Sequence, residues 1–153
     1  MWRSQMFRPK TGILWWNLRD AWPILSDAIV DYYNSKKLAY YYMKRVQTNI
    51  CAMVTDDFKV VAANATPKSA KIKVSVTDID SGKELMTKEY TAPANSSSDI
   101  GKIPEQEGQG MLLIKYSVDG GKEQTNHYMY GKPPFKLSDY KKWFKKLEVE
   151  REK

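Results

Sequence analysis

The stretch AKIKVSVTDIDSGKELMTKEYTA, residues 70–92, decides the fold of this chain. In its first half, Ile72, Val74 and Val76 fall on one side of an extended chain, and lysine, serine and threonine fall on the other. Ser81–Gly82 then marks a turn, and a second segment of similar length follows. Such alternation indicates a strand with one buried face. The stretch therefore predicts two antiparallel strands that share one side of a core.

The same period of two extends on both sides of this stretch, from residue 48 to residue 131. Residues 110–121, GMLLIKYSVDGG, place four apolar side chains on one face and end in a glycine turn typical of hairpins. About seven short strands at regular spacing indicate an antiparallel β-sandwich of immunoglobulin-like type, and the missing Cys–Trp–Cys pattern excludes an antibody-type domain. The expected strands cover 49–56, 58–66, 70–80, 83–92, a short run near Ile100–Ile103, 110–121 and 122–131.

Beyond the last strand, Pro133–Pro134 interrupts the sheet pattern and a helix is expected. Ser138 is the candidate N-cap. The segment from 132 to 153 carries eight lysines and arginines against four acidic residues, so it supplies +4 of the net charge of +7, and we expect these charges on a solvated helix face. The other face should dock on the sandwich through Leu137, Tyr140, Trp143, Phe144 and Leu147.

Before residue 48 the pattern is aromatic and helical. Residues 35–47 have the spacing of an amphipathic helix, with Ser35 as candidate N-cap. Residues 11–16, TGILWW, predict a buried parallel strand that is apolar on both faces, and residues 20–34 predict a long loop that contains Pro23. A parallel strand requires a neighbouring strand in its sheet. A lone strand–loop–helix unit is therefore expected to be part of a larger fold that supplies this neighbour.

Composition excludes several classes of protein. Cys51 is the single cysteine of the 153 residues, so no internal disulfide forms, and its apolar context predicts a buried strand residue. His127, the single histidine, cannot make a multi-histidine metal site, and no phosphate loop or CxxC motif occurs. We therefore expect no cofactor and no metal. No apolar run reaches the length of a membrane span, and Met1–Lys10 is not a secretory signal.

Residues 11–47 also carry a more specific pattern. Gly12 opens the expected strand, the pair Trp15–Trp16 ends it, and Asp20, Trp22 and Pro23 follow in the order Asp–x–Trp–Pro. Farther on come Asp31–Tyr32 and then Lys37, Tyr41 and Tyr42 in the order Lys–x–x–x–Tyr–Tyr. This pattern resembles the end of the catalytic barrel in glycoside hydrolase family 2, especially its β-mannosidase-like members. Residues 93–101 and 126–135 resemble the C-terminal sandwich of the same enzymes. Two positions depart from the family, where glutamine is usual at Asn17 and asparagine is common at Arg19.

The resemblance implies a division into three parts. Residues 1–47 would be the remnant of a (β/α)8 catalytic barrel, residues 48–132 the immunoglobulin-like sandwich, and residues 133–153 a C-terminal extension with the amphipathic helix. It also implies that the chain is a fragment of a larger hydrolase. In that parent only, Trp16 would stack on the bound sugar, and Asn17, Arg19 and Asp20 would lie beside it as hydrogen-bonding or structural groups.

The resemblance further implies that catalysis takes place elsewhere in the parent. Family members place two catalytic glutamates on earlier barrel strands, and the Asn–Glu pair that marks the acid/base is absent here, so no catalytic residue is assigned. The acidic cluster Asp20, Asp27 and Asp31 is read as solvated or capping groups rather than a carboxylate pair. The expected function is a non-catalytic, structural part of a retaining β-glycosidase.

Two other functions stay open at this point. One is a carbohydrate-binding module, since sandwiches often carry aromatic sugar platforms, here among Tyr90, Tyr116, Tyr128 and Tyr130. The other is a basic protein that binds nucleic acid. The favoured interpretation predicts neither a nucleic-acid partner nor a membrane. It predicts that the rest of the barrel is the partner of this chain and that oligosaccharide binds only in the full enzyme. It also predicts a possible homodimer through residues 11–33. The family resemblance implies a periplasmic or secreted location.

Overall fold

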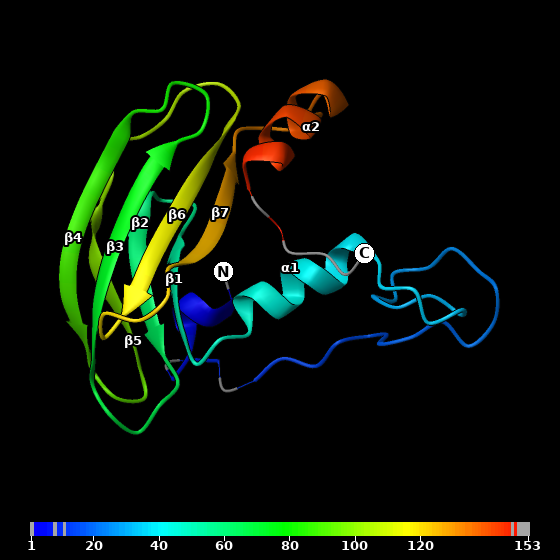
Figure 1. Ribbon diagram of the computed structural model, residues 1–153, viewed down its shortest axis with the longest axis horizontal. Helices are drawn as coiled ribbons and strands as arrows, with labels where there is room; N and C mark the ends of the chain where they lie inside the picture. Colours follow the sequence, from blue (N-terminus) through cyan, green and yellow to red (C-terminus); the bar gives the residue numbers. More distant parts are fainter. Residues whose placement is uncertain (1, 8, 11, 148, 150–153) are drawn as a thin grey trace.

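The computed structural model describes residues 2–7, 9–10, 12–147 and 149, and in them seven strands form two packed antiparallel sheets (Figure 1). One sheet has the order β1–β2–β5 and the other the order β4–β3–β6–β7. The strands are β1 (Ile50–Val54), β2 (Lys59–Asn64), β3 (Ala70–Asp78), β4 (Glu84–Ala92), β5 (Ser96–Lys102), β6 (Gly110–Val118) and β7 (Gln124–Tyr130).

The order of the strands identifies the type of sandwich. The chain leaves the first sheet after β2, builds the β3–β4 hairpin in the second, returns to pair β5 with β2, and crosses again to place β6 beside β3. Neighbours that are not consecutive in the chain are the mark of Greek-key connections between two sheets. The predicted immunoglobulin-like antiparallel β-sandwich is confirmed.

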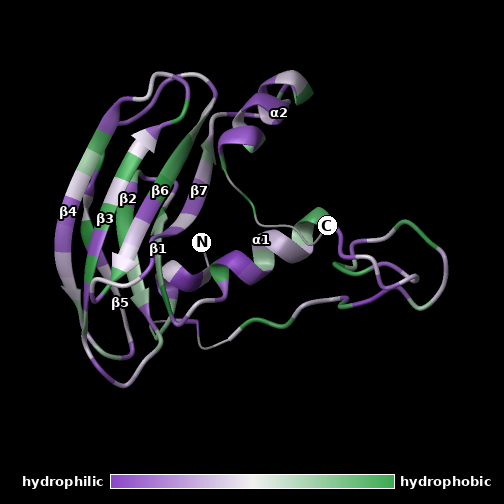
Figure 2. Cartoon of the chain, in the orientation of Figure 1, coloured by the Kyte–Doolittle hydropathy of each residue, from purple (hydrophilic) through white to green (hydrophobic). Residues whose placement is uncertain are grey.

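The core lies between the sheets and follows the alternation of the sequence. In β3 the side chains of Ile72, Val74 and Val76 are at most 1% exposed, and Lys71 and Lys73 between them are exposed. Figure 2 shows apolar and polar segments following one another along the strands. Strands β1 and β2 differ because every residue from Ile50 to Val54 and from Val60 to Asn64 is buried. The predicted burial of Cys51 in β1 is confirmed.

Strand β5 begins earlier than the sequence predicts. The expected run near Ile100–Ile103 is the end of a longer strand that starts at Ser96. The serine-rich part carries no alternation of apolar residues, and its position comes from pairing with β2, where Ala63 lies opposite Ser97 and Asn64 opposite Ser96. Backbone hydrogen bonds to a neighbouring strand thus fix a segment whose side chains give little strand signal.

The C-terminal helix α2 (Leu137–Lys146) docks on the sandwich, as predicted. Trp143 is 3% exposed and packs in one cluster with Ile79 and Met111, and its indole Nε1 donates a hydrogen bond to Asp80 Oδ2 at 2.8 Å. The N-cap is Lys136 and not the predicted Ser138, because the helix already includes Leu137. The exposed Leu137, at 65%, therefore lies outside the buried face.

Helix α1 (Leu38–Val46) bridges β7 and α2. The hydroxyl oxygens of Tyr42 and Tyr140 are 2.9 Å apart, and Arg45 donates to the backbone oxygens of Thr125 at 2.7 Å and Leu147 at 2.8 Å. Figure 1 shows α1 running away from the sandwich.

The predicted N-cap of this helix, Ser35, is wrong. The helix begins later, after Lys37. The amide of Ser35 instead donates to Asp31 Oδ1 at 2.7 Å, and its carbonyl accepts from the amide of Asp31 at 3.0 Å. These bonds fix Ser35 in a turn before the helix.

The N-terminal 3-10 helix η1 (Trp2–Gln5) is attached to the sandwich. Arg3 Nη1 donates to the carbonyls of Val46 and Thr48, each at 2.5 Å, and the hydroxyl of Ser97 in β5 donates to the carbonyl of Ser4 at 2.7 Å. One guanidinium therefore joins the start of the described chain to the connection between α1 and β1.

Residues 12–37, here named the aromatic loop, contain no helix and no strand. The predicted strand 11–16 is wrong for residues 12–16, which are irregular and exposed, and residue 11 lies outside the described residues. The physical reason is that neither sheet offers these residues a partner strand, so Leu14 is 98% exposed. Figure 1 shows the loop projecting away from the sandwich beyond α1, and Figure 2 shows apolar stretches along it.

Candidate functional site in the aromatic loop

The four predicted site residues separate into a surface group and one buried residue. Trp16 is 84% exposed, and Asn17 and Arg19 are also exposed. The guanidinium of Arg19 donates from Nη2 to the carbonyl of Tyr32 at 2.9 Å, which ties the two arms of the loop together. Asp20 is 3% exposed and lies inside the loop. Trp16, Asn17 and Arg19 are thus available to a partner or ligand, whereas Asp20 is placed as a structural group.

A small polar cluster surrounds Asp20. Lys37 Nζ lies 2.9 Å from Asp20 Oδ2, and the hydroxyl of Ser26 donates to Asp20 Oδ1. The same hydroxyl oxygen accepts from the amide of Ala28 at 3.0 Å, and Lys37 Nζ also donates to the carbonyl of Ser26 at 3.1 Å. The hydrogen bond from Ser26, followed by that from Lys37, holds the pKa of Asp20 below its ordinary value, although burial opposes the shift. The carboxylate is therefore charged at neutral pH.

Backbone hydrogen bonds close the loop around this cluster. The amide of Asp20 donates to the carbonyl of Val30 at 3.1 Å, and the amide of Val30 donates to the carbonyl of Leu18 at 3.0 Å. The amide of Lys37 donates to the carbonyl of Ile29 at 3.0 Å. Isolated bridges also join Val30 to Arg19 and to Lys36. Residues 18–37 are thus a folded unit in spite of their irregular backbone.

The surface of the aromatic loop is largely apolar. In the described part of the chain fourteen large apolar side chains are exposed, and ten of them belong to this loop. A typical monomer exposes apolar patches of only a few hundred Å² and buries its largest aromatic residues, so this concentration indicates an interaction surface. The ten are Ile13, Leu14, Trp15, Trp16, Leu18, Trp22, Ile24, Leu25, Tyr32 and Tyr33.

Among the described residues, the three aspartates of the acidic cluster have separate environments. Asp27 is exposed, and Asp31 accepts a hydrogen bond from the amide of Ser35. A general acid needs a raised pKa, and the opposite holds at Asp57, whose bonds to Lys59 and Thr55 lower its pKa to about 2. The pKa values of Asp20, Asp78 and Asp80 are also below the ordinary value. Five glutamates of the sandwich region are exposed: Glu84, Glu89, Glu105, Glu107 and Glu123.

The described residues offer neither a cluster of metal ligands nor a helix that could cross a membrane. Among the described residues, no group of three or more histidine, cysteine and acidic side chains could hold a metal ion. None of the described helices has the length and apolar character that crossing a membrane requires. In the described structure, the exposed apolar side chains of the aromatic loop are the feature that packing within this chain does not explain.

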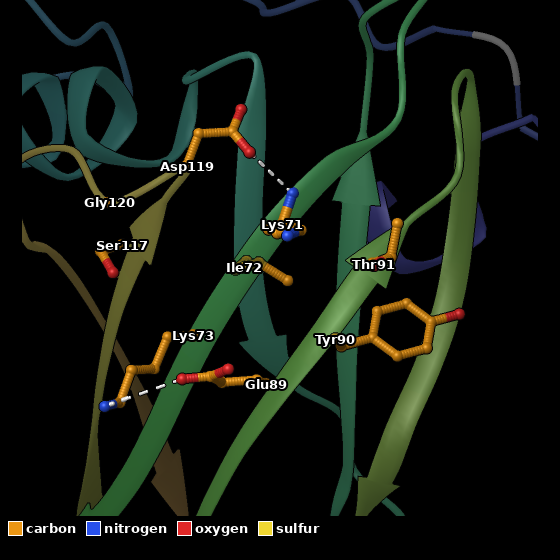
Figure 3. A pocket seen from close by; sticks show the side chains of 9 residues that line it. All are labelled: Lys71, Ile72, Lys73, Glu89, Tyr90, Thr91, Ser117, Asp119 and Gly120. Atoms are coloured by element: carbon orange, nitrogen blue, oxygen red, sulfur yellow. Dashed lines mark hydrogen bonds and ion pairs between the residues drawn. The ribbon is translucent and has the colours of Figure 1, made fainter.

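The second sheet carries a hollow that is large enough for a sugar. It has a volume of about 580 Å³ and lies along β3, β4 and β6 (Figure 3). Charged side chains dominate it, among them Lys73 and Glu89, whose charged groups lie 3.9 Å apart. Its one aromatic residue, Tyr90, is half-buried against the core, and Figure 3 shows its ring pointing away from Lys73 and Glu89. The hollow offers no exposed aromatic face for a sugar to stack on.

The other aromatic residues considered for a carbohydrate-binding module are also occupied. Tyr116 and Tyr130 are 2% and 8% exposed, and Tyr128 is half-buried against the core. The hydroxyl of Tyr130 donates to Asp78 Oδ2 at 3.2 Å, and the hydroxyl of Tyr128 donates to Asp56 Oδ1 at 3.0 Å. These side chains serve packing between the sheets.

Fold and site together define an immunoglobulin-like sandwich that carries an ordered, solvent-exposed aromatic loop. No protein-family model matches the chain. Its sequence is 26% identical over 158 residues to β-mannosidase B of Thermothelomyces thermophilus. That alignment covers 82% of this chain and 18% of the Thermothelomyces enzyme. It is 32% identical over 116 residues to β-mannosidase B of Aspergillus terreus. That alignment covers 73% of this chain and 11% of the Aspergillus enzyme.

Comparison with solved structures also identifies a β-mannosidase. The structure is similar to that of the β-D-mannosidase from Dictyoglomus thermophilum, with a TM-score of 0.66 and 26% identity, over 84% of this chain and 17% of that one. The chain is thus a distant homologue of β-mannosidase B over most of its length, and it corresponds to part of a β-mannosidase-like protein. It spans less than a fifth of the length of these relatives.

Two residues of the site were missed by the sequence reasoning. Neither Ser26 nor Lys37 was predicted as a partner of Asp20, from which they are six and seventeen residues away. A buried carboxylate in a loop requires a cation or several donors, but the sequence does not show that Asp20 is buried. Lys37 belongs to the same motif as Asp20, but spacing alone does not show that the chain returns to it.

Proposed function

We propose that this chain is a non-catalytic part of a retaining exo-glycosidase of the β-mannosidase type, and that it supports the end of the catalytic barrel. The observation that carries the proposal is the ordered but uncovered aromatic loop. Ten large apolar side chains face solvent there, while the ion pair between Asp20 and Lys37 holds the backbone in place. An ordered apolar surface of this kind fits a large partner that is absent from the structure.

The distant homology makes a barrel the natural partner. In this proposal the loop packs on neighbouring strands and loops of the barrel, and the sandwich acts as a platform at the barrel's edge. Two links fasten the flanks of the loop to the platform: Ser97 of β5 donates to the carbonyl of Ser4 in η1, and Arg45 of α1 donates to the carbonyl of Thr125 in β7. Both flanks of the loop are therefore attached to the sandwich.

Within the complete enzyme we propose that Trp16 stacks on the sugar at the cleaved position. Its indole is 84% exposed, so it is free to present an apolar face to a pyranose ring. Asn17 and Arg19, which are exposed beside it, are the candidate hydrogen-bonding groups. Asp20 acts from within the loop and orients this surface without touching the sugar. A periplasmic or secreted location is part of the same proposal.

A chimera tests the proposal. The matching segment of the Dictyoglomus thermophilum β-mannosidase, 17% of that chain, is replaced by residues 1–153 of this protein, and hydrolysis of an aryl β-mannoside is measured. We expect measurable activity, because the new segment brings the same support to the same barrel. Trp16→Ala should lower kcat/KM by about 10- to 100-fold, as expected when an aromatic sugar contact is lost.

Leu137→Ser is the matched control for this variant, since Leu137 is an exposed apolar residue outside the loop. It should leave kcat/KM of the chimera unchanged. A chimera whose sandwich is folded by circular dichroism but that has no activity would refute the supporting role. Full activity of the Trp16→Ala chimera would refute the sugar contact alone.

A further inference from the structure

We propose that the junction between β7 and α1 is an acid-operated hinge, which releases α1 and the aromatic loop from the sandwich when His127 takes up a proton. The released part turns about the connection between α1 and β1, and the two sheets stay folded. This inference concerns the contacts of α1 with the rest of the chain, and it does not rest on the proposed role in a glycosidase.

His127 lies where α1 meets β7. Its ring centroid is 4.8 Å from that of Tyr42 in α1, and its Nδ1 is buried without a hydrogen-bond partner. Two residues away in β7, the carbonyl of Thr125 accepts a hydrogen bond from Arg45 Nε at 2.7 Å. The imidazole of β7 therefore lies in the same contact as the guanidinium of α1, and a proton on the ring adds a second positive charge there.

The other elements packed at the junction present neutral or paired groups, as far as the described residues extend. Leu113 of β6 pairs with His127 in the register of the sheet. Lys115 of the same strand has its own ion pair with Glu123, at 3.0 Å. Helix α2 presents the ring and hydroxyl of Tyr140. A charged imidazole at this position is costly, because burial penalises a charge that no nearby group of opposite sign compensates.

Helix α1 is the element that can yield to this charge. None of its residues is buried, and the core between the two sheets includes no residue of α1. Helix α2 has a separate anchor, since Trp143 is buried and its indole donates to Asp80. Segments with few buried contacts open at a lower free energy than the core of a domain. Release of α1 therefore leaves the sandwich and its core intact.

The pivot of the hinge is the connection that follows α1. Arg3 Nη1 donates to the carbonyls of Val46 and Thr48, each at 2.5 Å, so one guanidinium holds both sides of the end of the helix. Gln47 between them ends the helix, with φ −89° and ψ 34°. The contacts with His127 and Thr125 lie at Tyr42 and Arg45, before this connection in the chain.

The sign of the effect follows from the two states of His127. Burial, and after it the positive charge of Arg45, lowers the pKa of His127 from 6.5 to about 4 while α1 is docked. After release the ring regains the ordinary pKa of about 6.5. The released state therefore binds the proton more tightly, and release becomes more favourable as the pH falls. By linkage the ratio of released to docked molecules rises about 20-fold between pH 7 and pH 5.

Hydrogen exchange of the full chain, followed by mass spectrometry at pH 7 and pH 5, tests the hinge. The measured rates are divided by the intrinsic exchange rates at each pH, so that they report opening of the structure. For amides of α1 we expect about 20-fold more opening at pH 5. Low urea should leave this opening unchanged and should increase the opening of β3, since a local release exposes little surface and global unfolding exposes much.

Two variants separate the proton from the packing. His127→Phe keeps a ring beside Tyr42 and removes the titrating group, so α1 should open to the same extent at both pH values. Tyr42→Phe is the matched control, because it removes the hydroxyl contact with Tyr140 and keeps the ring beside His127. It should open more than the unmodified chain at both pH values and keep the ratio of about 20 between them.

Equal opening of α1 at pH 7 and pH 5 in the unmodified chain would overturn the proposal. The same urea dependence for α1 and β3 would also overturn it, because α1 would then open only with the whole fold. A third contrary result is a His127 that titrates near pH 6.5 while α1 stays protected, since the ring would take up the proton without release. The proposed role in a glycosidase is measured separately, by activity of the chimera.

Discussion

Asp20 is the residue on which the order of the aromatic loop depends, because it is the buried charge to which both arms are attached. Lys37 binds it from the start of α1, and Ser26 binds it from the middle of the loop. Removing one member of a buried pair leaves the other charge without compensation. The cluster therefore explains how a segment without regular structure keeps a defined shape.

We expect Asp20→Asn to loosen the aromatic loop and to leave the sandwich folded. The amide keeps the size of the side chain but removes the charge that binds Lys37. Limited proteolysis should become faster within residues 12–37, and the melting temperature of the sandwich should stay the same. Asp27→Asn, at an exposed position of the same loop, is the matched control. Equal cleavage rates for the two variants would contradict this role of Asp20.

His127 gives the chain a pH-dependent stability. Burial lowers its pKa from 6.5 to about 4, and the nearby Arg45 adds to this shift. Its Nδ1 is buried without a hydrogen-bond partner, and its ring lies 4.8 Å from the ring of Tyr42. The folded state therefore favours the neutral imidazole at the junction of β7 with α1.

The sign of the pH dependence follows from the lowered pKa. Between about pH 4 and 6.5 the unfolded chain binds more protons at His127, so the free energy of unfolding falls as the pH falls. From pH 7 to pH 5 we expect this residue to contribute a loss of about 2 kcal/mol, measured by urea denaturation. His127→Phe keeps a ring beside Tyr42 and should flatten the pH dependence. An unchanged pH profile in this variant would contradict the assignment.

At the scale of elements, α2 shows how one side chain fixes a helix on a sheet. Trp143 combines burial against Ile79 and Met111 with a hydrogen bond from its indole to Asp80. Lys142 Nζ also contacts Asp80, at 2.6 Å, and with Trp143 it lowers the pKa of that carboxyl. The apolar contact holds the helix, and the hydrogen bond sets its orientation.

Two substitutions separate these contributions. Trp143→Phe keeps the apolar contact and should cost about 1–3 kcal/mol through the lost hydrogen bond to a charged acceptor. Trp143→Ala should cost about 3–5 kcal/mol, the usual effect of removing a buried tryptophan, and should release α2. Urea denaturation gives the free energies, and the rate of limited proteolysis within residues 137–147 reports the release of α2. Equal losses in the two variants would mean that packing contributes nothing to the docking.

The sequence predicted the elements whose own residues carry the pattern. Strand β3 alternates because one face is buried and the other is solvated, and the Asp119–Gly120 turn after β6 adopts the positive φ that its residues tolerate. The start of β5 was missed because it depends on pairing with β2. Residues 12–16 were expected as a strand because they are apolar, but a strand also needs a neighbour, and neither sheet provides one.

The candidate site was predictable to a similar extent. The motif pointed to the segment that contains Trp16, Asn17, Arg19 and Asp20, and the structure shows the first three at the surface. The partners of Asp20 could not be read from spacing, because they depend on how the loop folds back. Burial of Asp20 was hidden for the same reason.

The whole molecule consists of a stable platform and an uncovered apolar projection. The sandwich buries its own core, α1 links β7 to α2, and the aromatic loop extends beyond α1 (Figure 1). The net charge of +7 lies outside the loop, since residues 12–37 are neutral and the segment 132–153 carries +4. The projection is therefore neutral as well as apolar.

The central proposal is that this chain contributes a surface, and no catalytic centre, to a β-mannosidase-like enzyme. Hydrolysis of aryl β-mannoside and aryl β-galactoside by the chain alone, at about 100 µM protein, measures this most directly. We predict a rate equal to that of the uncatalysed reaction. Saturable turnover that disappears when one carboxylate of this chain is substituted by its amide would contradict the claim.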